Sequence, residues 1–425
     1  MNISNINNFI NVKWHFWATD VSVAVARIYR WRNERSEFFV SRKILLRYYY
    51  QINSSNNFRK RTIIYTILLN FKGDFLMFKK FITVASSLAL SAMCLTGCNQ
   101  TTTDKEAKKT LDKVTIAEVT HSVFYAPQYA AVTKGFFEEE GIEVDIINTS
   151  GADKTMAALI SGEAQVGLMG PEASIYVYNQ GNENYAVNFA QLTKTDGSFI
   201  VAREEMPNFT LEDLKGKDIL GGRKGGVPLM TLEYVLKKNG LTIGTNKEAG
   251  EVNVRTDVQF GVMAGAFAGG EGDFTTAFEP TGTQMEEEGT GYIVASVGEL
   301  SREVAGDVPY TAYSTTKEFM ADNEDLIQRF TNALYKGQQW CKTASSEEIA
   351  QAMQPFFNDL SLNDLISVVD RYKEVDAWCD NPLFTEESLN ALVEIMEEAG
   401  ELDKAPVYND IVNTEFANKA MENVK

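Results

Sequence analysis

Histidine is nearly absent from this chain, and cysteine is scarce. Its 425 residues include two histidines, His15 and His121, and four cysteines. These counts exclude a zinc site built on several histidines and a catalytic network that needs more than one of them. Cys341 and Cys379 lie in helical-looking sequence near the C-terminus, where they could pair outside the cytoplasm or remain free thiols. We therefore expect no metal, no cofactor and no catalytic residue.

Positive charge is also scarce. The chain has 40 Lys and Arg against 58 Asp and Glu, a formal net charge of −18. The excess of acid is concentrated after residue 98, because residues 1–76 hold 12 Lys or Arg against only 4 Asp or Glu. A body this acidic repels phosphate backbones, so nucleic acid is not expected as a partner. No apolar stretch after residue 98 reaches the about 20 residues that a membrane-spanning helix needs.

One stretch near the start has the layout of an export signal. Met77 and two lysines precede an apolar run at 81–90, and small residues lead to Leu95-Thr96-Gly97-Cys98. This order is typical of a signal peptide, and the apolar run is too short to remain as a membrane span. The last four residues resemble a bacterial lipobox, whose cysteine becomes the first mature residue and carries a diacylglycerol. The alternative is an ordinary secretory signal with an incidental cysteine.

The resemblance to a lipobox divides the first part of the chain. It implies that residues 77–97 are removed as a lipoprotein signal and that lipidation of Cys98 anchors the chain at the extracytoplasmic face of the cell membrane. The polar, Thr- and Lys-rich residues 98–111 are expected to form a linker. Residues 1–76 keep no helix or strand period, and we interpret them as wrongly translated upstream sequence. A basic segment that binds nucleic acid or membrane is the alternative.

From residue 113 onward, apolar strands and helices alternate. Residues 113–119, a helix that begins near Pro127 and stops at Gly135, and residues 142–147 form a β-α-β unit. The alternation continues through two series, and helices dominate after residue 316. The sequence predicts an α/β fold of two lobes, each a mainly parallel sheet flanked by helices, with a helical C-terminal extension. We place lobe I at 112–200 plus 308–425 and lobe II at 201–307, with extended crossings near 199–203 and 308–314.

Several blocks of the α/β region share a pattern with a known family. They are FYAPQYAA at 124–131, KGFFEEEGIEV at 134–144, AALISGEAQVG at 157–167, LEDLKGK at 211–217, and GDF to FEP at 272–280. This series resembles the solute-binding proteins of ABC importers for sulfonates, nitrate, riboflavin and thiamine pyrimidine precursors. The resemblance implies a type II-like periplasmic-binding-protein fold and a hinged monomer that closes on a small-molecule ligand. It also implies an ABC permease in the membrane as partner.

Loops that follow strands are expected to hold the ligand. In open α/β sheets a ligand binds beyond the carboxyl ends of the strands, where helix N-termini converge. This rule selects, after the first three strands, His121, Ser122, Phe124, Tyr125, Ser150, Gly151, Gly170 and Glu172, and from the turn before the fifth strand, Ser198. From the second lobe it selects Arg223, Lys224, Gly225, Gly226, Phe278 and Glu279.

The loop at 221–226 is the strongest of these candidates. Its glycines let backbone N–H groups approach a ligand, the helix that follows adds a positive end, and two cations lie beside it. A carboxylate, sulfonate or phosphate would fit there, and a tight turn with solvated cations is the alternative. Phe124 and Tyr125 could stack on a planar ligand or belong to the core. Glu279 could bind ligand amines or cap the next helix, and Glu172 is interpreted as a favourable first-turn charge.

The resemblance leaves more than one function open. We expect a lipid-anchored receptor for import that binds a small organic solute by lobe closure. The alternative is an enzyme, because a fungal relative of this fold makes the thiamine pyrimidine with a cysteine-rich iron motif and a sacrificial histidine. The α/β region here has no cysteine cluster, and export would remove the chain from the metabolic pool. A third possibility is an anchored adhesin or sensor that uses the same cleft without a permease.

N-terminal mapping is expected to find a precursor that starts at Met77 and a lipidated mature chain that starts at Cys98. A signal peptide has to lie at the N-terminus to be recognised. Mass spectrometry of the N-terminal peptides measures both ends, and a Cys98→Ser variant is the control because it cannot form the thioether. A precursor that keeps residues 1–76, or a mature chain without lipid, would contradict the prediction.

Overall fold

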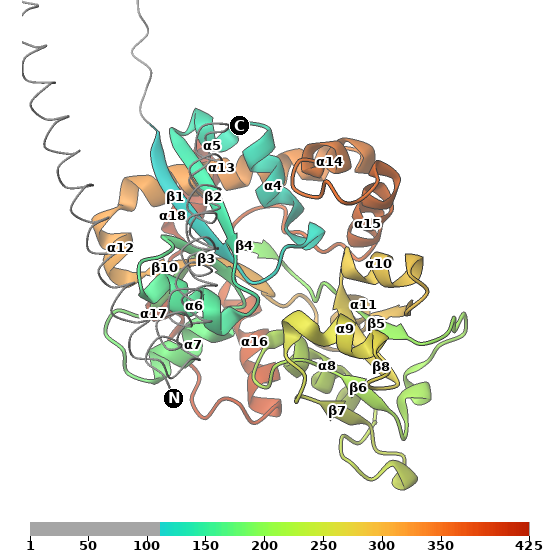
Figure 1. The fold of residues 1–425 in the computed structure, drawn as a ribbon. Coiled ribbons are helices and arrows are strands. Elements are labelled where there is room, and N and C mark those ends of the chain that lie inside the picture. Colours follow the sequence, from blue (N-terminus) through green and yellow to red (C-terminus); the bar gives the residue numbers. More distant parts are fainter. Residues whose placement is uncertain (1–110, 425) are drawn as a thin grey trace, which may run out of the picture. The chain divides into compact units, whose positions relative to one another are not determined.

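The computed structural model describes residues 111–424, and Figure 1 shows their course. These residues form two five-stranded sheets, with strand orders β2-β1-β3-β10-β4 and β7-β6-β8-β5-β9. The signal at 77–97, Cys98 and most of the expected linker lie outside the described residues. Within the described part, no helix is both long and apolar enough to cross a membrane.

The first sheet is built from both ends of the described chain. Its strands are β1 Asp112–Glu118, β2 Ile142–Asn148, β3 Val166–Met169, β4 Ala186–Thr193 and β10 Thr311–Thr316. Strand β1 pairs in parallel with β2 and β3, whereas β10 runs antiparallel to β3 and β4. The connecting helices are η1 Val123–Tyr125, α4 Ala126–Thr133, α5 Phe136–Glu139, α6 Ala152–Ile160 and α7 Glu172–Asn179.

Side chains of β3 alternate between two helical layers, as the period of two in a strand requires. Val166 and Leu168 join the main core, which also holds residues of α4 and α13, Glu324–Thr343. Met169 packs in the cluster formed by α6 and α7. A Cβ added at Gly167 would lie 3.2 Å from a methyl group of Thr155 in α6, so this helix lies close against the sheet. The first sheet is therefore covered on both faces, which explains why β3 is buried at every residue.

The second sheet comes from the middle of the chain. Its strands are β5 Ser198–Ala202, β6 Asp218–Leu220, β7 Asn253–Arg255, β8 Phe274–Phe278 and β9 Tyr292–Ser296. Its helices are η2 Leu211–Leu214, α8 Val227–Lys238, η3 Lys247–Ala249, η4 Phe260–Val262, α9 Met263–Ala268, α10 Thr281–Glu287 and α11 Val297–Ala305. Ile200 packs with α8 on one face, and the neighbouring Val201 packs with α9 and α10 on the other.

The two sheets are mixed, each with two parallel and two antiparallel strand pairings, where the sequence predicted mainly parallel sheets. Strand β5 runs antiparallel to β8 and β9, as β10 does to its neighbours in the first sheet. The segments expected to be extended crossings are largely these two strands, each formed as the chain arrives in the next sheet. The passages between the sheets are shorter, at residues 194–197 and 306–310.

Helices dominate the C-terminal part, as expected. They are α12 Lys317–Asp322, α13, α14 Ser346–Met353, α15 Leu362–Glu374, α16 Glu386–Glu398, α17 Tyr408–Ile411 and α18 Glu415–Asn423. Side-chain oxygens of Ser345, Ser361 and Thr385 cap the N-termini of α14, α15 and α16, because each accepts a bond from an otherwise unpaired backbone N–H. Helix α13 lies so close to α4 that a Cβ at Gly337 would meet the Pro127 carbonyl at 2.5 Å.

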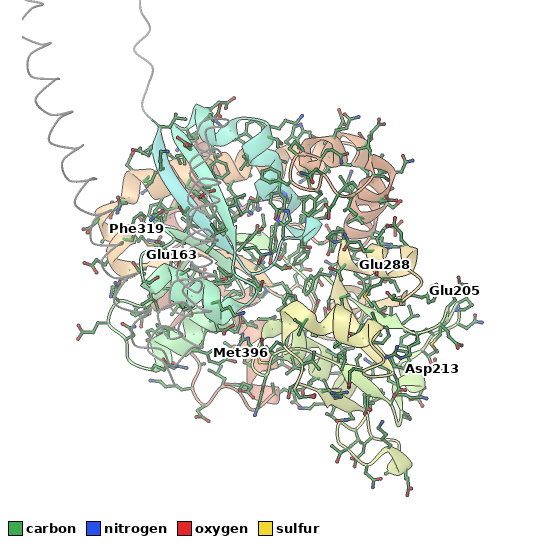
Figure 2. All side chains as sticks on the ribbon, in the orientation of Figure 1. Glu163, Glu205, Asp213, Glu288, Phe319 and Met396 are labelled. Carbon is green, nitrogen blue, oxygen red and sulfur yellow. The ribbon has the colours of Figure 1, made fainter. Side chains whose placement is uncertain are left out.

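Helix α16 connects the lobes. Ile395 and Met396 are buried in the main core, which also holds Met230 and Tyr234 of α8, and Figure 2 labels Met396 on this helix. On another side of α16, Glu394 accepts a 2.7 Å hydrogen bond from the Tyr234 hydroxyl of α8. Lys237 of α8 donates to the Glu398 carbonyl at 2.8 Å. Helix α16 of the C-terminal extension is therefore both packed in a core that the two lobes share and hydrogen-bonded to α8 of the second lobe.

The two cysteines within the described residues are free. Cys341 is buried and Cys379 is half-buried. Burial raises the pKa of both thiols, because a thiolate loses its hydration there. Both side chains therefore remain neutral and act as packing groups.

Replacement of Ile327 by Ala is expected to lower the free energy of unfolding by about 2–5 kcal/mol, because it leaves a cavity in the main core. Ile327 of α13 is 1% exposed. Ile160→Ala is the matched control, since Ile160 ends α6 and is 48% exposed; we expect a change within about 0.5 kcal/mol. Urea unfolding measures both, and equal losses would contradict this description of the core.

Candidate functional site

Loops that follow strands of both sheets contact one another between the lobes. The Ser122 hydroxyl, after β1, donates to the Glu279 carbonyl after β8. Nη2 of Arg223, after β6, lies 3.4 Å from Oε1 of Glu172, after β3. The Tyr176 hydroxyl donates to the Gly225 carbonyl at 2.9 Å. The structure therefore brings several of the expected site residues to one place, with both lobes contributing.

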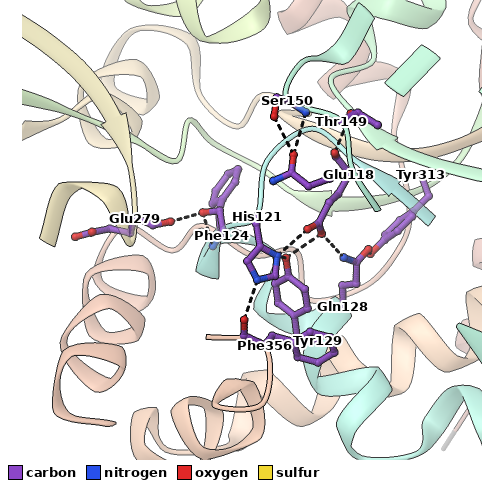
Figure 3. Close-up of polar contacts among 12 residues, drawn as sticks. Glu118, His121, Phe124, Gln128, Tyr129, Thr149, Ser150, Glu279, Tyr313 and Phe356 are labelled. Carbon is purple, nitrogen blue, oxygen red and sulfur yellow. Dashed lines mark hydrogen bonds and ion pairs between the residues drawn. The ribbon is translucent and has the colours of Figure 1, made fainter. Parts of the chain in front are cut away.

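Glu118, the last residue of β1, is the centre of a buried polar network (Figure 3). Its side chain is fully buried, and its Oε2 accepts from Gln128 Nε2 at 2.9 Å and from the Tyr129 hydroxyl at 2.8 Å. Gln128 in turn accepts a 3.0 Å bond from the Tyr313 hydroxyl. This carboxylate is thus supplied with donors from the protein itself, as a buried charge requires.

His121 completes this network. Its Nδ1 lies 2.9 Å from Glu118 Oε1, and its Nε2 lies 3.0 Å from the Phe356 carbonyl (Figure 3). Both partners can accept a hydrogen bond, so these contacts favour the protonated imidazole, in which both ring nitrogens are donors. The hydrogen bond to Glu118 raises the pKa of His121 accordingly, and the ring stacks on Phe357 at 4.5 Å. His121 therefore fixes the loop after β1 to the segment before α15 and has no nitrogen left for a ligand.

Aromatic rings fill the region between the loops. Phe124 is fully buried, with ring centroids of Phe278, Tyr310 and Tyr372 at 5.7, 5.8 and 5.3 Å. A Cβ at Gly197 would lie 2.5 Å from the Phe124 ring, so only glycine lets the passage between the sheets run over this ring. Tyr372 also donates to the Gly197 carbonyl and accepts from the Glu279 amide, both at 3.0 Å. Phe124 and Phe278 thus line the meeting point of the lobes.

Three polar groups beside these rings lack partners. Asp196 Oδ2, Ser198 Oγ and the Tyr310 hydroxyl are buried without a hydrogen bond, although Oδ1 of Asp196 accepts from the Ser198 amide at 2.7 Å. Burial raises the pKa of Asp196 to about 7, and hydrogen bonding from the nearby Ser198 and Tyr310 hydroxyls opposes the shift. An unsatisfied buried polar group costs about 1–3 kcal/mol, and these two hydroxyls are donors that can reduce that cost for Asp196.

Glu172 is the fourth such residue. It is 1% exposed, and its Oε2 has no partner, while Oε1 faces Arg223. Burial raises the pKa of Glu172 to about 7, although the charge of Arg223 opposes the shift. Burial raises the pKa of Tyr125 and Tyr310, and the charge of Glu172 adds to both shifts. Glu172 is therefore more than a first-turn charge of α7, because a solvated charge would not be buried with an unpaired oxygen.

The glycine-rich loop at 221–226 does not present free cations. Arg223 is directed to Glu172 and, at 3.7 Å, to Asp153. Lys224 lies 3.4 Å from Glu401 and is largely exposed. The loop also borders a hollow of about 330 Å³ that Gly225 and Glu233 line. The expected anion site therefore has its positive charge already matched by acids from other segments.

Glu279 makes contacts within the protein. Its Oε2 accepts a 2.8 Å bond from the Thr283 amide, so it caps α10, the second of the two roles considered for it. Its Oε1 pairs with Arg371 of α15, and Arg371 also lies 2.8 Å from Glu286 of α10. Arg371 thus joins the C-terminal helices of the first lobe to the second lobe.

The other expected residues lie at the margin of this region. Ser150 is exposed and has a φ of 57°. It lies close to Gly261 of the second lobe, since a Cβ added to that glycine would be 3.6 Å from the Ser150 Cβ. Gly151 begins α6, and Gly226 begins α8. A Cβ at Gly170 would lie 2.0 Å from Glu172 Oε2, so glycine makes room for that carboxylate. Tyr125 is buried beside Phe124.

Several residues of the site carried no sequence signal. Glu118, Asp196, Tyr310 and Arg371 were not selected by the rule that takes loops after strands, because they lie in a strand, in the passages and in a C-terminal helix. A buried carboxylate at a strand end or in a short passage is recognisable only once its burial is known. The assembled site offers hydrogen-bond acceptors and aromatic faces, which suit binding of a small molecule.

Comparisons with known proteins show the family to which this chain is related. A family model described as NMT1/THI5 like matches residues 123–347. The "Putative binding protein YtlA" of Bacillus subtilis (strain 168) is 44% identical over 312 residues, which cover 73% of this chain and 91% of that protein.

Solved structures share the fold. The periplasmic nitrate-binding protein NrtA of Synechocystis PCC 6803 matches with a TM-score of 0.61 and 16% identity, over 74% of this chain and 89% of that one. The "putative sulfonate ABC transporter, periplasmic sulfonate-binding protein SsuA" of Methylobacillus flagellatus KT matches with a TM-score of 0.54 and 20% identity, over 74% and 95%. The "desulfurization enzyme DSZB" matches with a TM-score of 0.53 and 12% identity, over 73% and 99%. The two lobes therefore have the periplasmic-binding-protein fold, as the sequence predicted.

Asp196→Asn is expected to remove a pH-dependent loss of stability. The folded-state pKa of about 7 lies above the ordinary 3.8. The stability linked to this group is therefore fully present below pH 3.8 and is lost as pH rises through about 7. Across this pH window the free energy of unfolding of the variant should increase relative to that of the wild type. Above the window the difference between the two should stay constant. Urea titrations in a pH series measure the difference. The control is Asp145→Asn, at an exposed position, whose free energy of unfolding should change with pH in parallel with that of the wild type. An Asp196→Asn curve that is also parallel to the wild type would contradict the prediction.

Proposed function

Because the chain belongs to the NMT1/THI5-like family, we propose that it is the substrate-binding component of an ABC importer and closes its two lobes on a small organic solute. The observation that carries this proposal is the meeting of strand-end loops from both lobes around buried polar atoms that have no partner in the protein. A ligand between the lobes would supply those partners. The solute classes considered are thiamine pyrimidine precursors, riboflavin-like molecules and sulfonates or nitrate.

Closure would work by population shift. Two passages, 194–197 and 306–310, join the sheets and are short enough to act as a hinge. A ligand that contacts both lobes only when they are together favours the closed form, and the permease distinguishes that form from the open one. The protein's own contacts between the lobes, such as those of Arg371 with Glu279 and Glu286, also stabilise the closed form.

The groups at the site support binding rather than turnover. A serine nucleophile needs an adjacent base, but Ser122 donates to a backbone carbonyl. Both nitrogens of His121 are occupied, by Glu118 and by the Phe356 carbonyl. The thiamine-pyrimidine-synthase-like enzyme considered from the sequence depends on a histidine that reacts. Here the hydrogen bond to Glu118 raises the pKa of the histidine at the site, and both of its ring nitrogens contact other groups of the protein.

The partners follow from this function. The chain would be anchored by a lipid on Cys98, act as a monomer at the extracytoplasmic face of the cell membrane and deliver its ligand to an ABC permease. Two acyl chains hold a protein at a membrane for long times, because each buried CH₂ contributes about 0.8 kcal/mol. The acidic body is suited to this position, since it has little tendency to bind the nucleic acids of the cytoplasm.

Arg371→Ala is expected to weaken ligand binding about tenfold by making the closed form less populated. A thermal-shift screen of pyrimidines, flavins and alkylsulfonates finds the ligand, calorimetry measures its affinity, and small-angle scattering measures closure as a smaller radius of gyration. We expect the variant to need more ligand for the same decrease in radius.

Arg329→Ala is the matched control for this experiment. Arg329 also bridges two acids, Asp112 and Asp325, but these lie within the first lobe. Its removal should leave ligand affinity unchanged. A wild-type protein that binds no member of the screen, or binds one without closing, would overturn the proposed function.

A further inference from the structure

The two passages that join the lobes lie beside a third segment, the turn at 375–379 that follows α15. The first passage, 194–197, begins directly after Thr193, the last residue of β4. Thr193 forms an antiparallel bridge with Trp378 of the turn. The second passage, 306–310, leads into β10. The turn is therefore placed where the chain leaves the first lobe.

Backbone hydrogen bonds join the three segments. The Lys194 amide donates to the Ala377 carbonyl at 3.0 Å, and the Val308 amide donates to the Lys194 carbonyl at 2.9 Å. Beside them, the Cys379 amide donates to the Leu192 carbonyl at 2.9 Å. The first passage thus has the second passage on one side and the turn on the other, like the middle strand of a sheet. Both polar groups of the Lys194 backbone hold this arrangement.

Arg302 holds the turn to the second lobe. It belongs to α11 and lies just before the second passage. Its Nη1 donates to the Val375 carbonyl at 2.7 Å, and its Nη2 donates to the Asp376 carbonyl at 3.0 Å. Its Nε lies 3.2 Å from Oδ1 of Asp307 in the second passage. One planar guanidinium therefore binds three acceptors in a fixed geometry, which the single ammonium of a lysine could not match.

The turn has an unusual backbone conformation at the residue that receives one of these bonds. Asp376 has a φ of 47°, in the left-handed region that residues other than glycine seldom adopt. Its carboxylate lies 2.7 Å from Nζ of Lys194 in the first passage. Such a conformation persists only where its surroundings fix it. Here two cations do so, Lys194 from the first passage and Arg302 from the second lobe.

We propose that the turn at 375–379 is a third component of the hinge, and that Arg302 is a positioning residue that restricts how the second lobe rotates. This inference rests on the proposed function, because a hinge serves binding only if the lobes close on a ligand. Contacts this close to the passages move little when the lobes rotate, so they are kept in the open and the closed form.

The clamp would act on the cost of closure. Two passages alone permit both bending and twisting of one lobe against the other. A third segment that is held to α11 leaves the bending motion and opposes the twisting motion. Closure then starts from fewer open orientations, so less conformational freedom is lost when a ligand binds.

The test measures the distance between the lobes in the ligand-free chain. Spin labels are attached at Glu163→Cys in the first lobe and Glu288→Cys in the second, two exposed positions that Figure 2 labels. Double electron–electron resonance gives the distribution of distances between the labels. We expect Arg302→Ala to widen this distribution and shift it to longer distances. Arg302→Lys should recover part of the narrow distribution, since an ammonium still donates to one carbonyl.

Arg203→Ala is the matched control. Arg203 also donates to main-chain carbonyls, those of Phe267 and Gly272 at 3.1 and 2.9 Å, but these lie in the second lobe with it. Its removal should leave the distance distribution unchanged. The chain without the introduced cysteines is the blank for labelling, and urea unfolding checks that each variant is folded.

A second variant covers the case in which Arg302→Ala does not fold. Asp376→Asn keeps a residue type that tolerates the left-handed region and removes only the charge that faces Lys194. It should widen the distribution in the same direction, and an unchanged width would count against the proposal.

The outcomes separate the hinge assignment from the proposed function. An Arg302→Ala distribution as narrow as that of the wild type would overturn the role of Arg302 and leave the binding function standing. Equal widening in Arg203→Ala would also overturn it, because loss of any carbonyl-binding arginine would then have the same effect. A wild-type distribution that no pyrimidine, flavin or alkylsulfonate shortens would overturn the proposed function, while the ligand-free widths would still decide the role of Arg302.

Discussion

Buried carboxylates set the requirements at the centre of this molecule. A carboxylate removed from water needs hydrogen-bond donors or a counter-charge, or it stays protonated. Glu118 meets this requirement with donors from α4 and from His121. Asp196 and Glu172 meet it only in part, and burial raises the pKa of both to about 7. The same chemical group is therefore a structural anchor at one strand end and an incomplete site at another.

The topology explains why the incomplete groups lie together. Strands β1, β3, β6 and β8 end toward the region between the lobes, and the passage at 194–197 crosses it. Gly197 allows this passage to lie against Phe124, which brings Asp196 and Ser198 beside the aromatic wall. The antiparallel strands β5 and β10 follow directly from the passages, and each is paired on both sides within its sheet. The passage at 194–197 thus both connects the two lobes and contributes residues to the candidate site.

The sequence predicted the architecture well because hydrophobic period and turn residues are local signals. The alternation of strands and helices, the helical C-terminal part and the family resemblance all depend on residues that are neighbours in the chain. The partner of Arg223 is not local, since Glu172 is 51 positions away. The glycine-rich loop was therefore interpreted as a site for an anion, although acids from other segments match its charge. Tyr310, Tyr372 and Arg371 likewise acquire their roles from contacts that no local pattern encodes.

The polar contacts between α8 and α16 are individually weak. A hydrogen bond within a protein contributes about 0.5–1.5 kcal/mol net, and an exposed ion pair about 0–1 kcal/mol. The pairs between α8 and α16 are partly exposed, so they belong to the lower end of this range. If the lobes close as proposed, a buried carboxylate that is short of donors weighs against the empty closed form, whereas one that the protein supplies with donors, like that of Glu118, does not.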